Sequence, residues 1–272
     1  MLKRSSRSCL GLALLGGNLL GGTLLAGTLL MAGTLLSCHL LAGAAIAQEA
    51  IAVPATAVPQ RAENLPSGIN DSFLDPDMKV EDFVKRFEVE SREVFACRQQ
   101  ILAAVGLEPG MAVADIGAGT GLYVAAFSQA VGPRGKVYAV DISPKFVKHL
   151  RQRAVDEQLP NVQAVLCSDR DVNLKPDSID RAFICDVYHH FEYPASSLAS
   201  IHAALRDGGE LILIDFHREG EGERGEWLRG HIRAPQAVFK QEIVDAGFQF
   251  EEEVNIDGFE ENYMLRFSKP AQ

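Results

Sequence analysis

The sequence predicts an α/β fold of three layers, in which a seven-stranded, mostly parallel sheet lies between helices. Short apolar runs alternate with longer amphipathic or Ala-rich segments from residue 113 onward, which is typical of strand–helix–strand units. A glycine-rich turn, residues 117–121, follows the first of these runs. The last two runs alternate apolar and polar residues, and this predicts an antiparallel C-terminal hairpin at the sheet edge.

The first long helix is expected over residues 80–105, because Phe83, Phe87 and Val94 recur at helical spacing. It packs on the sheet or, alternatively, closes over the site together with a lid-like segment at residues 70–77. Strands are expected at residues 113–116, 136–143, 161–166, 181–186, 211–215, 248–256 and 262–269. Further helices are expected at residues 122–131, 145–157, 195–205 and 236–246.

Composition limits the kinds of partner. The chain has 272 residues, 47% of them hydrophobic and 23% charged, which suits one sizeable domain. The net charge is −10, and residues 1–47 hold three basic residues and no acid, so the remainder carries −10 − 3 = −13. This acidic charge argues against a nucleic-acid partner, which needs a basic patch. It also argues against adhesion of the folded domain to an anionic membrane.

Residues 1–47 have the composition of a leader. Three basic residues are followed by Leu-Leu repeats without charge, and Ala45-Ile46-Ala47 offers a small-x-small cleavage site. This predicts a signal peptide. The apolar run also exceeds the roughly 20 residues that span a bilayer, and Leu35-Leu36-Ser37-Cys38 resembles a lipoprotein site. An uncleaved anchor and a lipidated Cys38 therefore stay open, and we expect an exported or membrane-anchored protein of the bacterial periplasm or cell envelope. A start of translation downstream of the leader would leave it cytoplasmic.

The rest of the chain divides into two parts. Residues 48–66 are rich in Ala and Pro and predict a linker. Residues 67–272 form the expected folded domain. Contact with a membrane is expected only through the leader.

The glycine turn carries the first functional signal. Asp115 precedes Gly117, Gly119 and Gly121. Glycine lets a ligand approach the backbone closely, and the next helix points free N–H groups at the same place. The spacing differs from the G-x-G-x-x-G dinucleotide fingerprint. A tight turn that binds no ligand is the alternative.

The pattern Asp-x-Gly-x-Gly-x-Gly resembles the first motif of the class I S-adenosylmethionine (SAM)-dependent methyltransferases, of the type 11 or type 25 kind. Two further segments are similar to motifs of that family: residues 174–180 before the fourth strand, and Leu205-Arg206-Asp207-Gly208-Gly209, with Asp207 where proline is usual. The resemblance covers about residues 80–270. It implies a Rossmann-like fold and SAM as cofactor, with the amino-acid part of SAM against the glycines and Asp115 near its ammonium group.

Acidic residues after the next strands complete the predicted cofactor site. Asp141 ends the second strand, where a carboxylate can accept hydrogen bonds from both ribose hydroxyls, although an ordinary acid near a helix N-cap is the alternative. The resemblance places Asp169 at the adenine amino group, with Asp171 as a near neighbour, and Asp186 near the methionine part. The predicted cofactor-binding residues are Asp115, Gly117, Ala118, Gly119, Thr120, Gly121, Asp141, Ile142, Asp169, Arg170 and Asp186.

Polar residues after the fourth and fifth strands are candidates for the acceptor side. Tyr188, His189 and His190 are the catalytic candidates near the sulfonium methyl, with a structural role as the alternative. Residues 216–230 are polar and Gly-rich and predict an acceptor-recognition loop, with substrate contacts from His217, Arg218 and His231 or simple exposure to solvent. Cys97, Cys167 and Cys185 are scattered, so neither a disulfide framework nor a metal site is expected.

The predicted function is transfer of the sulfonium methyl to a small molecule or envelope component by in-line displacement. Such a reaction depends mainly on positioning, so it needs no catalytic triad. A SAM- or nucleoside-binding module without turnover is one alternative. An NAD-dependent oxidoreductase is another, disfavoured by the glycine spacing. A small-molecule partner is favoured over a protein, and the oligomeric state stays open.

Overall fold

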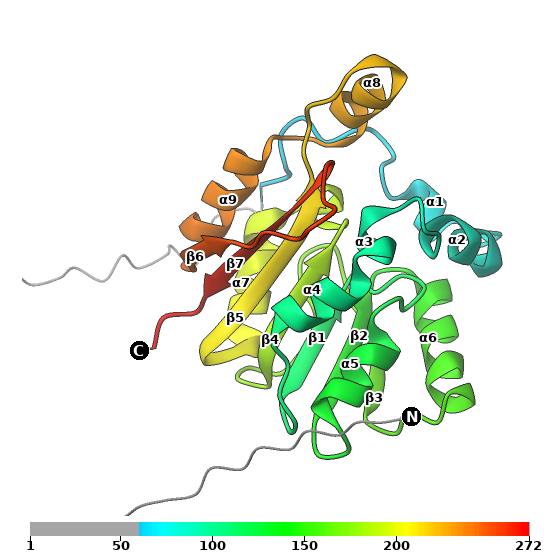
Figure 1. The fold of residues 1–272 in the computed structure, drawn as a ribbon, viewed down its shortest axis with the longest axis vertical. Coiled ribbons are helices and arrows are strands. Elements are labelled where there is room, and N and C mark those ends of the chain that lie inside the picture. Colours follow the sequence, from blue (N-terminus) through cyan, green and yellow to red (C-terminus); the bar gives the residue numbers. More distant parts are fainter. Residues whose placement is uncertain (1–59, 272) are drawn as a thin grey trace, which may run out of the picture. The chain divides into compact units, whose positions relative to one another are not determined.

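The computed structural model describes residues 60–271. They all lie in one unit of the chain. Its centre is a seven-stranded sheet in the order β3-β2-β1-β4-β5-β7-β6 (Figure 1). Strands β1 to β5 are parallel, whereas β7 is antiparallel to both β5 and β6. The strands are β1 Ala112–Ile116, β2 Lys136–Asp141, β3 Val162–Leu166, β4 Ile179–Cys185, β5 Leu205–Phe216, β6 Gln249–Glu253 and β7 Asn262–Ser268.

Helices cover both faces of this sheet. They are α1 Asp71–Leu74, α2 Val80–Phe87, α3 Glu93–Ala96, α4 Arg98–Val105, α5 Val124–Val131, α6 Pro144–Asp156, α7 Pro194–Ala204, α8 Gly222–His231 and α9 Gln236–Asp245, with a short 3-10 helix, η1, at Tyr188–His190. Apolar side chains of α4 and α5 share one core with Val113, whereas those of α7 and α9 share another with its neighbour Ala114. Successive residues of a strand point to opposite faces, so the predicted three-layer sandwich is confirmed.

The segment 80–105 is not the single helix that its periodicity predicts. It forms α2, α3 and α4, and the helix breaks at Glu88, whose φ and ψ are −102° and 61°. Phe83 packs with Phe146 of α6, whereas Ile101 packs in the core beside β1. One straight helix cannot bury its apolar side chains at both places. Packing on the sheet, the first of the two alternatives, is thus confirmed for α4, whereas closure of the segment over a cofactor stays a prediction.

The segment after β5 also differs from the prediction. A loop was expected over residues 216–230, but Gly222–His231 is the helix α8. Three of its ten residues are glycine, which disfavours a helix. Tertiary contacts compensate: Leu228 is buried, and Gly225 lies so close to Gly220 that a Cβ would be 2.1 Å from the Gly220 oxygen.

The described end of the predicted linker is bound to the domain. Ala62 donates its N–H to the Glu192 carbonyl oxygen at 2.7 Å. Arg61 forms an ion pair with the Glu192 carboxylate at 3.1 Å. Residues 48–59 and the predicted leader, residues 1–47, lie outside the described residues. Between residues 60 and 271, no helix combines the length and the apolar character needed to cross a membrane.

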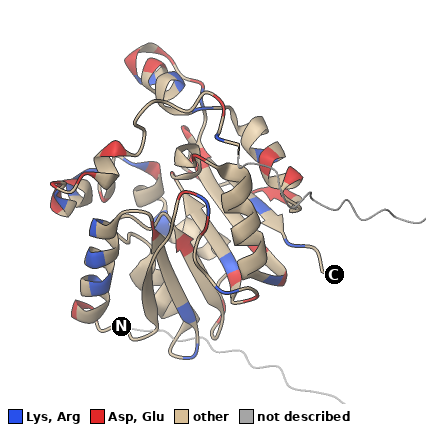
Figure 2. Cartoon of the chain, turned by 180° about the vertical axis from the view of Figure 1, so that it is seen from behind, with Lys and Arg blue, Asp and Glu red and all other residues tan. Residues whose placement is uncertain are grey.

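Charged residues of both signs are interspersed over the outer helices, the loops and the strand ends (Figure 2). Helix α8, for example, carries two acidic and two basic residues. Within the described strands, the buried charged residues are Asp115, Asp141 and Asp215. All three stand at the carboxyl ends of parallel strands, where open α/β sheets bind their ligands.

Candidate functional site

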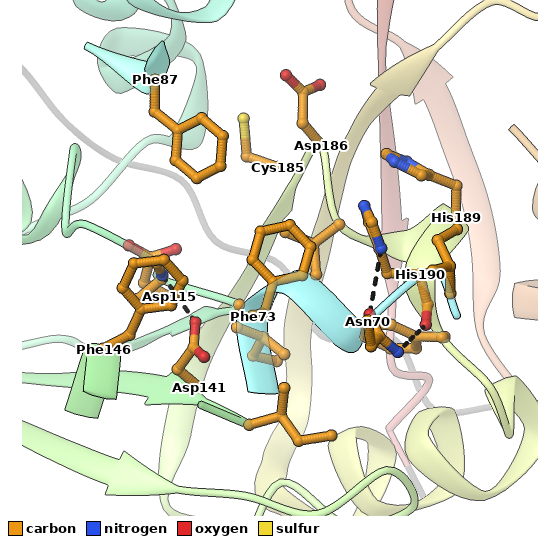
Figure 3. A pocket seen from close by; sticks show the side chains of 18 of the residues that line it. Asn70, Phe73, Phe87, Asp115, Asp141, Phe146, Cys185, Asp186, His189 and His190 are labelled. Carbon is orange, nitrogen blue, oxygen red and sulfur yellow. Dashed lines mark hydrogen bonds between the residues drawn. The ribbon is translucent and has the colours of Figure 1, made fainter. Parts of the chain in front are cut away.

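A cavity of about 630 Å³ opens along the carboxyl ends of β1, β2, β4 and β5. Its volume is typical of small-molecule sites, which span roughly 300–1,000 Å³. The glycine turn lines one side, η1 lines another, and α1, α2 and α8 contribute the outer wall (Figure 3). The cavity therefore brings together segments that lie more than 100 residues apart in the sequence.

The glycine turn contains three residues with positive φ, of which Gly117 and Gly119 line the cavity and Gly121, with φ 88°, does not. Gly117 has φ 75° and Gly119 has φ 52°, conformations that glycine adopts without strain. A Cβ on Gly117 would lie only 2.4 Å from a methyl carbon of Val187, so β1 and the segment after β4 meet there without room for a side chain. The turn backbone is thereby exposed to the cavity, with Gly117, Ala118, Gly119 and Thr120 in its lining.

Asp141 fixes the turn to the end of β2. Its Oδ2 accepts the Gly119 N–H at 2.8 Å, and its Oδ1 accepts the Ser143 N–H at 2.8 Å. Burial raises the pKa of Asp141 to about 6, although these hydrogen bonds favour the charged form. The Ser143 hydroxyl does not cap α6 as its position suggests, because it has no hydrogen-bond partner among the described residues. Each oxygen of Asp141 keeps a further lone pair for a ligand.

Asp115 is a buried carboxylate for which the described part of the chain offers no hydrogen-bond partner. Only 4% of its surface is exposed, and no hydrogen bond between described residues reaches its carboxylate. Burial and the nearby Asp141 raise its pKa to about 7. Because a buried charge needs a partner, this carboxylate favours a cationic group in the cavity.

Asp186 stands on the opposite side and is partnered. It pairs with Arg92, and its Oδ1 accepts a hydrogen bond from Asn262 Nδ2 at 2.7 Å. Burial raises its pKa to about 7 although Arg92 opposes the shift. Arg92 was not predicted, because no motif marks it and the break between α2 and α3 brings it here.

Most of the other predicted cofactor residues also line the cavity. Ile142 and Asp169 do so, as does the alternative Asp171. Two predicted residues do not. Gly121 faces Leu150, whose methyl would lie 2.7 Å from an added Cβ, so its role is close packing of α6. Arg170 lies over the Tyr193 ring, with 3.9 Å between the guanidinium and the ring centroid.

Of the three catalytic candidates, Tyr188 does not reach the cavity. Its side chain is fully buried in the core, and its hydroxyl donates to Glu242 Oε2 at 2.7 Å. This corrects the prediction: in the 3-10 turn, Tyr188 points toward α9 and packs on Phe239. His189 and His190 do line the cavity.

Both histidines are held by named partners. His189 Nδ1 lies 2.7 Å from Asp215 Oδ1, and His190 Nδ1 lies 3.2 Å from Asn70 Oδ1. Burial lowers the pKa of His189 to about 3 and that of His190 to about 2. Both rings are therefore neutral at physiological pH.

The segment after β5 contributes His231, together with Arg224 and Trp227 of α8. Burial lowers the pKa of His231 to about 4. The other two substrate candidates, His217 and Arg218, do not line the cavity. Arg218 instead donates to the Ile232 carbonyl oxygen at 2.9 Å.

Three phenylalanines form an apolar wall that the sequence alone did not assign to the site. Phe73, Phe87 and Phe146 line the cavity beside the glycine turn (Figure 3). The sequence showed Phe87 only as part of a helical stripe. An apolar wall opposite buried carboxylates suits a ligand with one flat apolar part and one cationic part.

Comparisons with known proteins agree with this geometry. Residues 114–213 match a family described as "Methyltransferase domain". A ubiquinone/menaquinone biosynthesis C-methyltransferase, UbiE, of Bordetella parapertussis is 28% identical over 117 residues, which are 43% of this chain and 45% of that protein. This chain therefore spans about half the length of the curated relatives that it matches.

Solved structures share the fold. A SAM-dependent methyltransferase from Aquifex aeolicus superposes with a TM-score of 0.61 and 22% identity, over 71% of this chain and all of that chain. The geranyl diphosphate C-methyltransferase of Streptomyces coelicolor, solved with Mg²⁺, geranyl-S-thiolodiphosphate and S-adenosyl-L-homocysteine, superposes with a TM-score of 0.56 and 11% identity, over 78% and 94%. The chain has the fold of the class I SAM-dependent methyltransferases.

Proposed function

We propose that this protein transfers the methyl group of SAM to a small-molecule acceptor. The observation that carries the proposal is the unpartnered, buried carboxylate of Asp115 beside a glycine turn that Asp141 holds in place. The methyltransferase domain match over residues 114–213 supports it. The fold shared with SAM-dependent methyltransferases supports it as well.

The charges of the cavity fit SAM. Asp115, Asp141 and Asp186 are three of the six carboxyl groups that line it, and three arginines line it as well, of which Arg92 pairs with Asp186. A ligand that carries an ammonium and a sulfonium group compensates the remaining negative charge. NAD carries a diphosphate instead, and a phosphate beside three carboxylates is unfavourable.

The residues divide into groups by the part of SAM that they would hold. The backbone of Gly117 to Gly119 and the carboxylate of Asp115 would hold the amino-acid part. Asp141 would bind the ribose hydroxyls, and Asp169 with Ile142 would bind the adenine. The aromatic wall, Phe73, Phe87 and Phe146, would exclude water from the apolar parts of the ligand.

When bound, SAM supplies a methyl carbon that the sulfonium already activates for displacement. The chain's own contribution is to hold donor and acceptor in line, which accounts for about 7–11 kcal/mol of barrier lowering in well-oriented reactions. The rings of His190 and His231 line this cavity, but burial lowers the pKa of both, so they are weak bases toward an acceptor that must lose a proton.

The wall formed by Phe216, Trp227 and His231 lies at the other end of the same cavity. The Trp227 and His231 rings stack at 4.5 Å, and the edge of Phe216 meets Trp227 at 6.2 Å. Aromatic surfaces of this kind favour a flat, largely apolar acceptor with a few polar atoms. The relatives named above act on quinone-pathway and prenyl diphosphate compounds by their printed names, and a small apolar acceptor agrees with them.

Calorimetric titration of the full-length protein with SAM and, separately, with NAD tests the cofactor assignment. We expect saturable heat with SAM and none with NAD. Absence of heat with SAM, or a preference for NAD, would contradict the proposal. Asp215→Asn lies outside the proposed SAM contacts and serves as a matched acidic control, since its SAM affinity is expected to stay near the wild-type value.

A binding module without turnover is the second candidate, because the cavity geometry alone requires only binding. The two differ in one observable. A methyltransferase releases S-adenosylhomocysteine when SAM and a cell-envelope small-molecule extract are both present, whereas a binding module does not. Release that depends on the extract supports catalysis, and saturable SAM binding without any release supports the module.

A further inference from the structure

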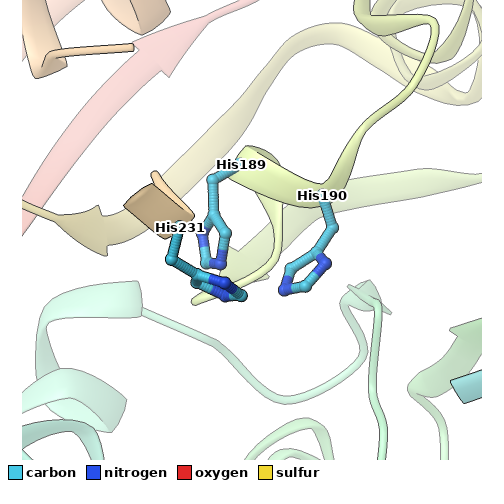
Figure 4. Close-up of side chains that lie close together, drawn as sticks. All are labelled: His189, His190 and His231. Carbon is cyan, nitrogen blue, oxygen red and sulfur yellow. The ribbon is translucent and has the colours of Figure 1, made fainter. Parts of the chain in front are cut away.

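Three histidine side chains converge on one point of the cavity wall (Figure 4). His189 and His190 come from η1 after β4, and His231 is the last residue of α8. One ring nitrogen from each lies within 4.8 Å of the other two. The ring centroids are 4.3, 5.0 and 5.2 Å apart. No sequence motif joins these residues, because 40 intervening positions separate His190 from His231.

The three rings have the chemistry of metal ligands. Each ring can offer one nitrogen to the same point, and a neutral imidazole nitrogen is the commonest metal ligand in proteins. Among the hydrogen bonds between described residues, none uses the Nε2 atom of His189 or the ring of His231. These ring nitrogens are therefore available to a cation that lies between the three rings.

A second set of contacts orients each ring. Asp215 Oδ1 lies against His189 Nδ1, and the same carboxylate accepts the backbone N–H groups of Phe216 at 2.8 Å and His189 at 3.1 Å. A carboxylate that accepts three N–H groups places the proton of His189 on Nδ1, which leaves Nε2 free for a ligand. This carboxylate–histidine pairing is what holds histidine ligands in metal proteins.

The other two rings are also fixed in place. Asn70 holds His190 through its Oδ1, and Trp227 stacks on His231 with an interplanar angle of 21°. Arg86, which also lines the cavity, lies over the Phe83 and Phe87 rings. The other two cations of the lining are paired with carboxylates: Arg224 with Glu261 at 2.6 Å, and Arg92 with Asp186. Their charge is thereby partly offset at the histidine cluster.

We propose that His189, His190 and His231 bind a divalent transition-metal ion of the zinc class, with one coordination position open to the cavity. Three neutral imidazoles with an open fourth position are the ligand set of catalytic zinc sites. Imidazole also suits Fe, Ni and Cu, whereas Mg²⁺ and Ca²⁺ prefer oxygen ligands. Three nitrogens that lie within 4.8 Å of one another are at most about 2.8 Å from a common centre, so each ring moves inward by no more than roughly 0.8 Å to reach tetrahedral Zn–N distances of about 2.1 Å.

The open position determines a class of acceptor. A metal ion there binds an oxygen anion such as a phenolate, enolate or carboxylate and lowers the pKa of a hydroxyl that coordinates it. The acceptor would then be held by its own oxygen beside the aromatic wall of Phe216 and Trp227. This second step rests on the proposed methyl transfer, whereas metal binding by the three histidines does not.

Titration of the full-length, tag-free protein with Co²⁺ tests the site directly, because Co²⁺ replaces Zn²⁺ and gives visible absorption bands that report its ligands. We expect one Co²⁺ per chain, displaced by Zn²⁺. His231→Ala and His190→Ala each reduce the affinity at least tenfold. His217→Ala is the matched control, since His217 lies outside the cluster, and its affinity is expected to be unchanged.

Removal of the orienting carboxylate gives a further readout. Asp215→Asn is expected to weaken Co²⁺ binding about 10–100-fold, as loss of such partners does elsewhere. Circular dichroism spectra identify any variant that fails to fold, and His231→Ala is the decisive variant because its side chain is only half-buried at the end of a helix. Absence of stoichiometric Co²⁺ binding, or equal binding by the His231→Ala and His217→Ala variants, would overturn the proposal.

Two added measurements separate this proposal from the methyltransferase function. SAM calorimetry on the same samples tests the proposed methyltransferase function alone. SAM binding without Co²⁺ binding would contradict the metal-site proposal and leave the methyltransferase proposal standing. Co²⁺ binding without SAM binding would contradict the methyltransferase proposal and leave the metal site standing. Acetohydroxamate, a small oxygen chelator, probes the open position. A shift of the Co²⁺ bands on its addition supports an open position that accepts oxygen ligands, and an unchanged spectrum means that the position is closed.

Discussion

Asp141 Oδ2 accepts the backbone N–H of Gly119 at 2.8 Å, and this contact joins the end of β2 to the turn after β1, together with the Gly117 and Ala118 N–H groups that donate to the Val140 carbonyl oxygen. The two residues are 22 positions apart. The parallel register pairs Ile116 with Val140, which brings the turn and the carboxylate to the same sheet edge. Asp141 therefore shapes the glycine turn in addition to its proposed contact with the ribose.

Replacement of Asp141 by alanine tests this double role. We expect Asp141→Ala to weaken SAM binding by about 1–3 kcal/mol, because charged hydrogen bonds to the ligand are lost. The Gly119 N–H is left without its acceptor, so the free energy of unfolding should also fall. Asp141→Asn keeps an acceptor oxygen for Gly119 and is expected to recover stability more than affinity. Calorimetry and chemical denaturation measure the two effects, and an unchanged affinity would remove the ribose assignment.

The pH dependence of SAM binding follows from Asp115. Its pKa is raised to about 7 by burial and by Asp141, so below pH 7 the carboxyl must lose a proton before it can pair with an ammonium group. We expect the affinity to fall as pH decreases below 7, by up to about tenfold per pH unit for this one group. An α-amino group titrates near pH 8, so the affinity also falls above that pH.

Calorimetry between pH 5.5 and about 9 checks this prediction. Asp115→Asn is the control, because it removes one titrating group and should make the acid limb less steep. Asp186, whose pKa is also about 7, still titrates in this variant. An affinity that stays constant from pH 5.5 to 8 would contradict the assignment of Asp115 to the ammonium group.

The ion pair between Arg92 and Asp186 predicts a pH-dependent stability difference. The pKa of Asp186 is raised to about 7 in the folded protein, against about 3.9 in an unfolded chain. Between about pH 4 and 7 the Asp186 carboxyl holds a proton in the folded protein and has lost it in the unfolded chain. The free energy of unfolding therefore falls as pH rises through this range, and it levels off above pH 7. Without Arg92 the pKa of Asp186 in the folded protein rises further, so the free energy of unfolding continues to fall above pH 7.

We accordingly expect Arg92→Met to be less stable than the wild type by about 1–3 kcal/mol at pH 9 and nearly as stable at pH 5, where Asp186 is protonated in both folded proteins. Denaturation at the two pH values measures this. Arg92→Lys keeps the charge and should show a smaller difference at pH 9. An equal deficit at both pH values would mean that packing of the Arg92 side chain matters and its charge does not.

The contact between Gly117 and Val187 predicts a coupled pair of substitutions. Gly117→Ala places a Cβ 2.4 Å from a Val187 methyl carbon and forces a positive φ on alanine. We expect a loss of about 2–4 kcal/mol of unfolding free energy from overpacking and backbone strain together. Val187→Ala in the same chain relieves the clash and leaves the strain, so the double variant should lose less than the sum of the singles.

Denaturation of the wild type, both single variants and the double variant gives the coupling energy. Gly132→Ala serves as a control, because Gly132 also has positive φ but a Cβ there meets no atom within 4 Å. Additive effects at Gly117 and Val187 would show that the close approach is relieved by backbone movement.

The fold could be predicted from the local pattern of apolar runs and glycines in the sequence. Apolar runs at β1, β2, β4 and β5 mark buried strands, and the glycine turn after β1 marks the ligand edge, because these signals depend on residues next to each other in the chain. The prediction of a single helix over residues 80–105 was wrong. Phe83, Phe87 and Val94 keep helical spacing, but Phe83 and Phe87 pack against other partners than Val94 does, on the two sides of a break in the helix.

The same distinction between local pattern and tertiary packing applies to the residues of the candidate site. By itself the sequence determined the motif Asp115–Gly121, the acid at Asp141 and a segment with two histidines after β4, since each follows a strand at a fixed short distance. The tertiary structure decided that Tyr188 points into the core while His189 and His190 face the cavity, that Arg92 reaches Asp186, and that His231 meets the histidine pair. Each of these depends on where a turn directs a side chain or on how a distant helix is placed. Such placements are set by packing across the whole domain, and no local spacing encodes them.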